Sequence, residues 1–179
     1  MSIQELVTVL TPPNVPIETG NSDSWPSIEK ALETPLPSDY KEYINTFGTG
    51  IIGYLIRVLN PFSSRPLFAL FFQVNEIIST RKWYKAKFGD DWCPYPLYPE
   101  PDGLLPWANT IDGDALFWYT RGRPETWPIV VAEVKSKDFE VFDLPTTSFL
   151  RQVITGGLTS NILAEIDLDR LFELPTGAS

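Results

Sequence analysis

The chain has 179 residues, a length that fits one domain or one domain with a tail. Its 23 acidic and 14 basic residues give a net charge of −9, which argues against binding to nucleic acid or to an anionic membrane and suits solubility and a basic protein partner equally well. The lack of histidine and the single cysteine exclude Ser-His-Asp and Cys-His catalysis, His-ligated metals, a Cys-based zinc site and an internal disulfide.

The first 23 residues differ in composition from the rest of the chain. Residues 1–23 hold a short amphipathic stretch, "IQELVTVL", followed by a Pro-rich connector. Nothing in them resembles a signal peptide, so a cytoplasmic location is expected. The remaining residues, 24–179, are predicted to form one domain.

Two helices are predicted next. Residues 24–33 place Trp25, Ile28 and Leu32 on one apolar stripe, at spacings of three and four. After the helix-breaking "TPLP", Ser38 is a suitable N-cap for a second helix, "SDYKEYINTFG". Both helices are short, as a chain with 17 prolines favours.

A β-branched run, "IIGYLIRVLNP", then predicts one strand. The longest helix is predicted from about Pro66 to Phe88, where it begins with proline and ends before Gly89. Its basic residues toward the C-terminus resemble a phosphate-binding patch, but a solvated helix end is the favoured interpretation. These residues are Arg81, Lys82, Lys85 and Lys87.

The second half of the chain indicates consecutive strands and one more helix. A loop rich in proline and aromatic residues leads to predicted strands at 104–111, 114–120, 127–135 and 139–144, which are joined by credible turns. "PTTSFLRQVITGG" predicts a helix with a threonine cap. This order predicts an α+β fold with helices packed on one twisted antiparallel sheet.

The stretch "LPWANTIDGDALFWYTRG" predicts a hairpin. If Asp112-Gly113 is a two-residue turn, Asn109 pairs with Leu116 and Trp107 pairs with Trp118. The two tryptophans would then form a cross-strand pair on one face of the sheet.

Acidic residues gather in the loops around these strands. Between Lys87 and Arg121 the chain has no basic residue and eight large aromatic residues. Carboxylates that steer a basic protein, with aromatic anchors beside them, would suit an interface, although most of the aromatic residues are expected in the core. The candidate partner-binding residues are Asp90, Asp91, Glu100, Asp102, Asp112 and Asp114.

Catalytic and metal-binding roles for these acids are less favoured. A glycosidase needs a carboxyl with a raised pKa, and carboxyls at a wet turn make poor general acids. The acids around Asp112 lack the ligand spacing of a calcium loop. No catalytic residue, metal or cofactor is therefore predicted, and Cys93 is expected to be a partly buried apolar residue.

Two stretches together resemble the SUKH superfamily, in its branch related to the fungal cell-wall assembly regulator. The first is "WPSIEKALETPLPSDYKEYINTFGTG"; the second is "LPWANTIDGDALFW" with "GRPETWPIVV". The resemblance spans roughly residues 25–157 and implies an α+β fold without enzymatic activity.

The resemblance also implies a function. Bacterial members resemble immunity proteins that bind and block a cognate toxin, frequently a nuclease, and fungal members resemble regulatory interaction modules. A toxin-neutralising immunity protein with a basic toxin as partner is the first hypothesis, a regulatory module is the second, and a carboxylate hydrolase is a distant third. The oligomeric state is left open.

Overall fold

One antiparallel sheet forms the centre of the computed structural model, which describes residues 3–175. Its seven strands lie in the order β6-β5-β4-β3-β2-β1-β7, with every neighbouring pair antiparallel. The strands are β1 (Ile51–Ile52), β2 (Ile56–Val58), β3 (Leu104–Thr110), β4 (Ala115–Tyr119), β5 (Ile129–Ala132), β6 (Phe139–Phe142) and β7 (Phe172–Glu173). The α-helices are α1 (Ile3–Val7), α2 (Trp25–Ala31), α3 (Ser38–Phe47), α4 (Leu70–Phe88) and α5 (Thr146–Ile154). The predicted α+β class is confirmed.

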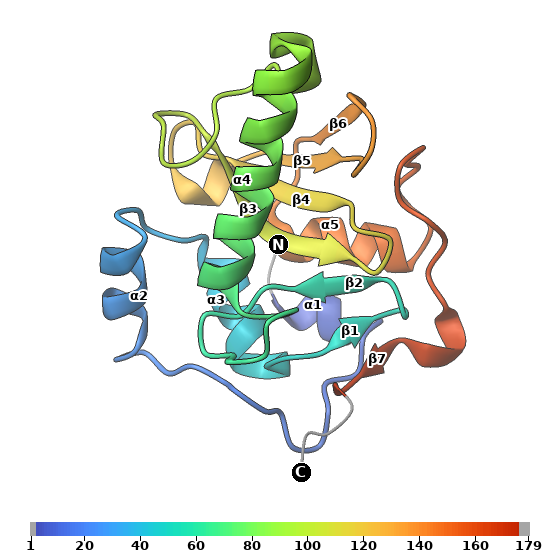
Figure 1. Ribbon diagram of the computed structural model, residues 1–179. Helices are drawn as coiled ribbons and strands as arrows, with labels where there is room; N and C mark the ends of the chain where they lie inside the picture. Colours follow the sequence, from blue (N-terminus) through green and yellow to red (C-terminus); the bar gives the residue numbers. More distant parts are fainter. Residues whose placement is uncertain (1–2, 176–179) are drawn as a thin grey trace.

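Helices cover both faces of this sheet (Figure 1). Helix α4 lies on one face, where Asn109 of β3 donates to Gln73 at 3.0 Å. Helices α3 and α5 lie on the other face, where the Trp118 ring meets the Tyr40 ring edge-on at 4.8 Å. The central strands are thus buried on both sides, and every residue of β3 is buried.

The N-terminal segment contributes to the same core. Leu6 and Leu10 are fully buried in the cluster that contains the sheet residues, and α1 packs against α3 and α5. The boundary between residues 23 and 24 stays a prediction.

Two predicted helix caps are wrong. Pro37, rather than Ser38, precedes the first turn of α3, and no side chain caps that helix. Pro145 precedes α5, which also lacks a cap from its own threonines. Instead, the Asp39 carboxylate at the start of α3 accepts from the Thr147 N–H at 2.8 Å and from its hydroxyl at 3.1 Å. One carboxylate therefore lies at the positive ends of two helices.

The single strand predicted from the apolar run after α3 is wrong as well, because the run folds into the hairpin of β1 and β2. Gly53 and Tyr54 form its turn with positive φ angles of 56° and 52°. The C-terminal segment fixes this turn: the Gly53 N–H donates to the Leu171 carbonyl, and a Cβ on Gly53 would lie 2.3 Å from the Ile166 side chain.

Helix α4 begins at Leu70, later than the predicted Pro66. Its basic end is not wholly solvated, which corrects the prediction for Arg81. That side chain is 3% exposed, and it donates to the carbonyls of Ala132 and Glu133. Lys82 and Lys87 are exposed as expected.

The turn between β3 and β4 has three residues rather than the predicted two. The Thr110 N–H donates to the Asp114 carbonyl at 2.9 Å, and Gly113 takes a φ of 98°. This is the three-residue hairpin loop that ends in a left-handed residue. The pairing consequently slips by one, so that Asn109 lies opposite Ala115.

The tryptophan contact nevertheless exists. A bulge between Pro106 and Ala108 shifts the register again, and Leu105 becomes the partner of Trp118. The Trp107 ring stacks beside the Trp118 ring, with centroids 5.9 Å apart and planes 19° apart. The predicted contact is confirmed, but the predicted register is wrong.

Candidate interaction surfaces

The six acids predicted to bind a partner lie at three separate places. Asp90 and Asp91 follow α4 in a 3₁₀ turn, η1 (Asp90–Trp92). Glu100 and Asp102 lie in the loop before β3, and Asp112 lies at the tip after it. Because the seven residues of β3 are separated by six steps of about 3.3 Å, its two ends are roughly 20 Å apart. The acids therefore do not form one continuous patch.

Asp114 differs from the other five because its carboxylate is buried. The residue is 5% exposed, and its Oδ2 accepts from the Thr110 hydroxyl at 3.1 Å. Its Oδ1 accepts from the Val134 N–H at 3.0 Å, which ties the hairpin tip to the loop after β5. The expectation of a wet carboxyl at this position is wrong, and Asp114 is a structural residue.

Glu100 and Asp102 line a cavity together with an acid that sequence reasoning did not select, Glu33. The cavity has a volume of about 280 Å³, and prolines and the rings of Tyr98 and Trp127 form its apolar walls. All three acids are exposed. We call Glu33, Glu100 and Asp102, with the cavity they line, the acidic pocket.

The loop that carries the acidic pocket is held in place by backbone bonds. The Glu100 N–H donates to the Leu97 carbonyl and the Gly103 N–H donates to the Glu100 carbonyl, both at 2.9 Å. A Cβ on Gly103 would lie 2.6 Å from the Tyr98 nitrogen, so glycine is needed for the close approach of the two strands of the loop. The two acids therefore project from a defined backbone.

The charged residues that line the acidic pocket are all acidic. No lysine or arginine lines it, and none of its three acids forms an ion pair within residues 3–175. The Tyr98 hydroxyl donates to the Leu32 carbonyl at its edge. Burial raises the pKa of Tyr98, and the charge of Glu33 raises it further, so that the phenol stays neutral beside the carboxylates.

A second surface lies at the C-terminal end of α4. Four rings meet there, with neighbouring centroids between 4.6 and 6.1 Å apart. They belong to Trp83, Tyr84, Phe88 and Trp92, which we call the aromatic tip. The Lys87 ammonium lies over the Trp83 ring at 4.5 Å and the Phe88 ring at 5.0 Å. Asp90 pairs with Lys85 at 3.4 Å beside this group.

Sequence reasoning missed Glu33, Trp83 and Tyr84 for different reasons. Glu33 lies two residues after α2 and far from Glu100 in the chain, and no local pattern connects them. The exposure of Trp83 could have been predicted from its position in the helix. It does not share the buried stripe of Val74, Ile78 and Arg81 on α4, so it faces outward.

Metal binding, cysteine catalysis and membrane insertion find little support in the described part of the chain. Within residues 3–175, no group of three or more His, Cys, Asp or Glu side chains is placed to hold a metal ion. Cys93 is fully buried, and burial raises the pKa of its thiol, which makes it a poor nucleophile. None of the helices in these residues has the length and hydropathy to cross a membrane.

One comparison with known proteins gives a match. The family model SUKH_6, described as SMI1-KNR4 cell-wall, matches residues 22–150. That range contains the acidic pocket and the aromatic tip and ends within α5. No curated protein and no solved structure gives a significant match.

Proposed function

This chain belongs to the SMI1-KNR4 cell-wall family of the SUKH superfamily, and we propose that it is an immunity protein that binds and neutralises a basic toxin domain. Protein interaction is the general role of the family, and the family is generally non-catalytic. The toxin, and the surface that meets it, are what the proposal adds.

The acidic pocket is the observation that carries this proposal. Three exposed carboxylates line one concave site, and no lysine or arginine is among its lining residues. A lysine or arginine side chain of a partner would enter such a site with its charge opposite the carboxylates, and charge-assisted hydrogen bonds are roughly twice as strong as neutral ones. The apolar walls would cover the stem of the same side chain.

Inhibition follows from occlusion. A nuclease holds its phosphate substrate with basic residues, so its cleft is itself a basic surface. A domain that places the acidic pocket on that cleft would exclude the substrate without any chemistry of its own. The net charge of −9 would accelerate the encounter through electrostatic steering.

A regulatory interaction module is the second candidate. The association of the family with the cell wall is the observation that supports a regulatory partner. The same acidic pocket would serve a basic regulatory partner, so the two candidates differ in the partner rather than in the surface. No observation favours the carboxylate hydrolase, because the Asp114 carboxylate is engaged by Thr110 and Val134.

The proposal is tested by capturing partners from the native host with the wild-type chain and with charge-reversal variants of it. We expect the wild-type chain to retain a basic protein that is toxic when expressed alone and harmless when expressed with this chain. The Glu100→Lys/Asp102→Lys variant should bind that protein at least about tenfold more weakly, mainly through a slower on-rate that becomes less salt-dependent.

The control carries the same change in net charge at a different place. Glu5→Lys/Glu42→Lys alters exposed acids of α1 and α3, which do not line the acidic pocket. Equal binding by both variants would contradict the proposed surface. A partner that is not toxic would reject the immunity role in favour of the regulatory module.

A further inference from the structure

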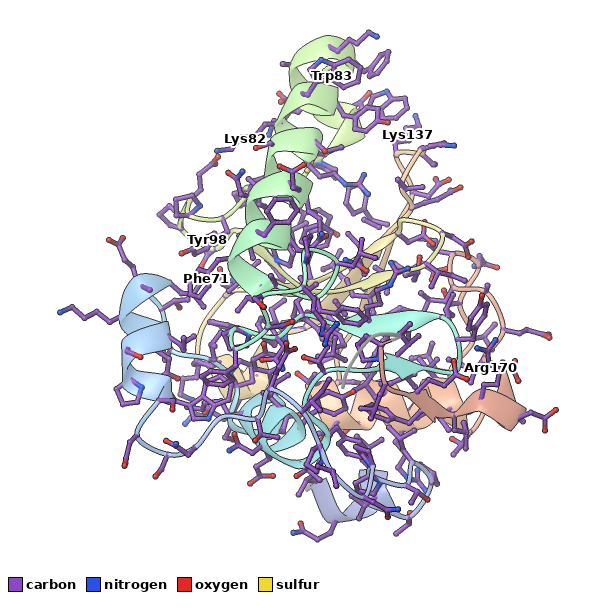
Figure 2. All side chains as sticks on the ribbon, turned by 60° about the horizontal axis from the view of Figure 1, so that its bottom comes forward. Phe71, Lys82, Trp83, Tyr98, Lys137 and Arg170 are labelled. Atoms are coloured by element: carbon purple, nitrogen blue, oxygen red, sulfur yellow. The ribbon has the colours of Figure 1, made fainter. Side chains whose placement is uncertain are left out.

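The aromatic tip is an unusual feature of this protein because it lies apart from the core. Trp83 is 53% exposed and Phe88 is 45% exposed, and none of the four rings packs against the buried core cluster. The end of α4 that carries them projects beyond the sheet (Figure 1). Figure 2 shows Trp83 and Lys82 at this end of the helix, away from Phe71 at the other end.

We propose that the aromatic tip is the contact surface of a weak, twofold-symmetric dimer of this chain. The proposal is independent of the proposed function. Large aromatic side chains are the residues most enriched at the energetic centres of protein interfaces. Here four of them lie together, where they are partly open to solvent.

The arrangement of the rings favours binding because it is already formed. The Phe88 and Trp92 rings stack with centroids 4.6 Å apart, and Tyr84 stacks on Trp92 at 5.4 Å. Lys87 lies over two of the rings. Side chains held in this way lose little conformational freedom on association, which lowers the cost of binding.

The charges beside the rings point to a second copy as the occupant. Lys82 directly precedes Trp83, and Asp91 directly precedes Trp92. Neither forms an ion pair with any residue that the structure describes. In a twofold interface each residue meets its complement on an identical surface. Lys87, which lies over two of the rings, forms no ion pair with the described residues either. A surface with an apolar centre and unpaired charges of both signs beside it is complementary to itself.

Other occupants fit this surface less well. Asp90 and Asp91 would approach the anionic headgroups of a membrane, which would repel them. A strongly basic protein would meet Lys82, Lys85 and Lys87. A second copy supplies both signs of charge, so that Lys82 and Asp91 can each meet an opposite charge.

The area of the aromatic tip limits the expected affinity of the dimer. A fully buried aromatic residue covers about 150–250 Å², and the rings of the aromatic tip are partly covered within the monomer already. The dimer interface therefore falls below about 1,200 Å², in the range of weak and transient complexes. We expect dissociation in the micromolar to sub-millimolar range, about 10 μM to 1 mM.

Sedimentation velocity of the full chain over a concentration series tests the dimer. We expect a reversible monomer–dimer equilibrium that Trp83→Ala weakens at least about tenfold. Phe72→Ala is the matched control, because Phe72 is an aromatic residue of the same helix with 50% exposure and lies outside the aromatic tip. It should leave the equilibrium unchanged.

Charge exchange tests the symmetry of the contact. Lys82→Glu and Asp91→Lys should each weaken the dimer, and the double variant should restore it. A chain that stays monomeric up to about 1 mM would overturn the proposal, as would a dimer insensitive to Trp83→Ala. Trp83-dependent binding to phosphatidylserine vesicles without self-association would assign the surface to a membrane instead. Glu100→Lys/Asp102→Lys should dimerise normally, which separates this test from that of the proposed function.

Discussion

Two tyrosines one turn apart on α3 differ in a single hydrogen bond. Tyr40 and Tyr43 are both fully buried. The Tyr40 hydroxyl donates to the Leu59 carbonyl at 2.6 Å, whereas the Tyr43 hydroxyl has no partner among the described residues. A buried polar group without a partner costs free energy that a partnered one recovers, so the same substitution should act differently at the two positions.

Replacing each tyrosine with phenylalanine tests this difference. Tyr40→Phe should lower the free energy of unfolding by about 1–2 kcal/mol, because it leaves the Leu59 carbonyl without its donor. Tyr43→Phe should leave stability unchanged or raise it by up to about 1 kcal/mol, because it removes only an unpaired hydroxyl. Urea unfolding followed by circular dichroism measures both, and equal losses in the two variants would contradict the assignment.

At the scale of elements, the β3–β4 hairpin is held by a buried carboxylate. Asp114→Ala should lower the free energy of unfolding by about 1–3 kcal/mol, because it leaves the Val134 N–H and the Thr110 hydroxyl without their acceptor. Asp112→Ala, two residues away and exposed, should change stability by less than about 0.5 kcal/mol. Thermal unfolding of the pair checks the contrast, and a neutral Asp114→Ala would show that the carboxylate is dispensable.

The same hairpin shows how far local sequence determines an element. Alternating aromatic residues and the Asp-Gly signal were sufficient to predict two strands with a turn at Asp112-Gly113. They were insufficient to choose between a two-residue and a three-residue loop, because Asp-Gly is compatible with both. The bulge beside Pro106, which returns Trp107 to Trp118, depends on packing across the sheet.

In the β1–β2 hairpin, by contrast, the local sequence does not predict the turn. Ile51 to Val58 is almost continuously apolar, and a tyrosine at the second turn position is a weak turn signal. The C-terminal segment imposes the turn, through the Gly53 contact with Ile166 and the Arg170 guanidinium 4.0 Å from the centre of the Tyr54 ring. Because these residues lie more than a hundred positions further along the chain, the sequence of the hairpin alone does not predict its turn.

At the scale of the whole molecule, the acidic pocket also depends on contacts between residues that are far apart in the chain. Sequence predicted that Glu100 and Asp102 would be exposed loop acids, which they are. Their grouping with Glu33 depends on how α2 packs against the loop before β3, and the burial of Asp114 depends on the loop after β5. Composition and turn residues thus indicated which acids were available, while tertiary packing decided which of them meet.

The core also makes the stability of the whole molecule depend on alkaline pH. Burial raises the pKa of Tyr40 far above its usual value, with a further increase from Tyr43, and burial raises the pKa of Tyr43. In the unfolded chain both phenols ionise near pH 10. Below about pH 10 the folded and unfolded states bind these protons equally, so the two tyrosines add no pH dependence there.

Above that pH the unfolded state releases protons that the folded state retains, so stability falls as pH rises. Each buried tyrosine contributes a slope of about 1.4 kcal/mol per pH unit, and the pair about 2.7. Urea unfolding at a series of pH values from about 8 to 11.5 should therefore show this decline. Tyr43→Phe removes one buried phenol and should reduce the slope by about 1.4 kcal/mol per pH unit. The Cys93 thiol and the Tyr98 phenol add to the decline in both proteins because burial raises their pKa values as well. The growing negative charge of the chain is common to both proteins, so an unchanged slope in the variant would refute the role of the buried tyrosines.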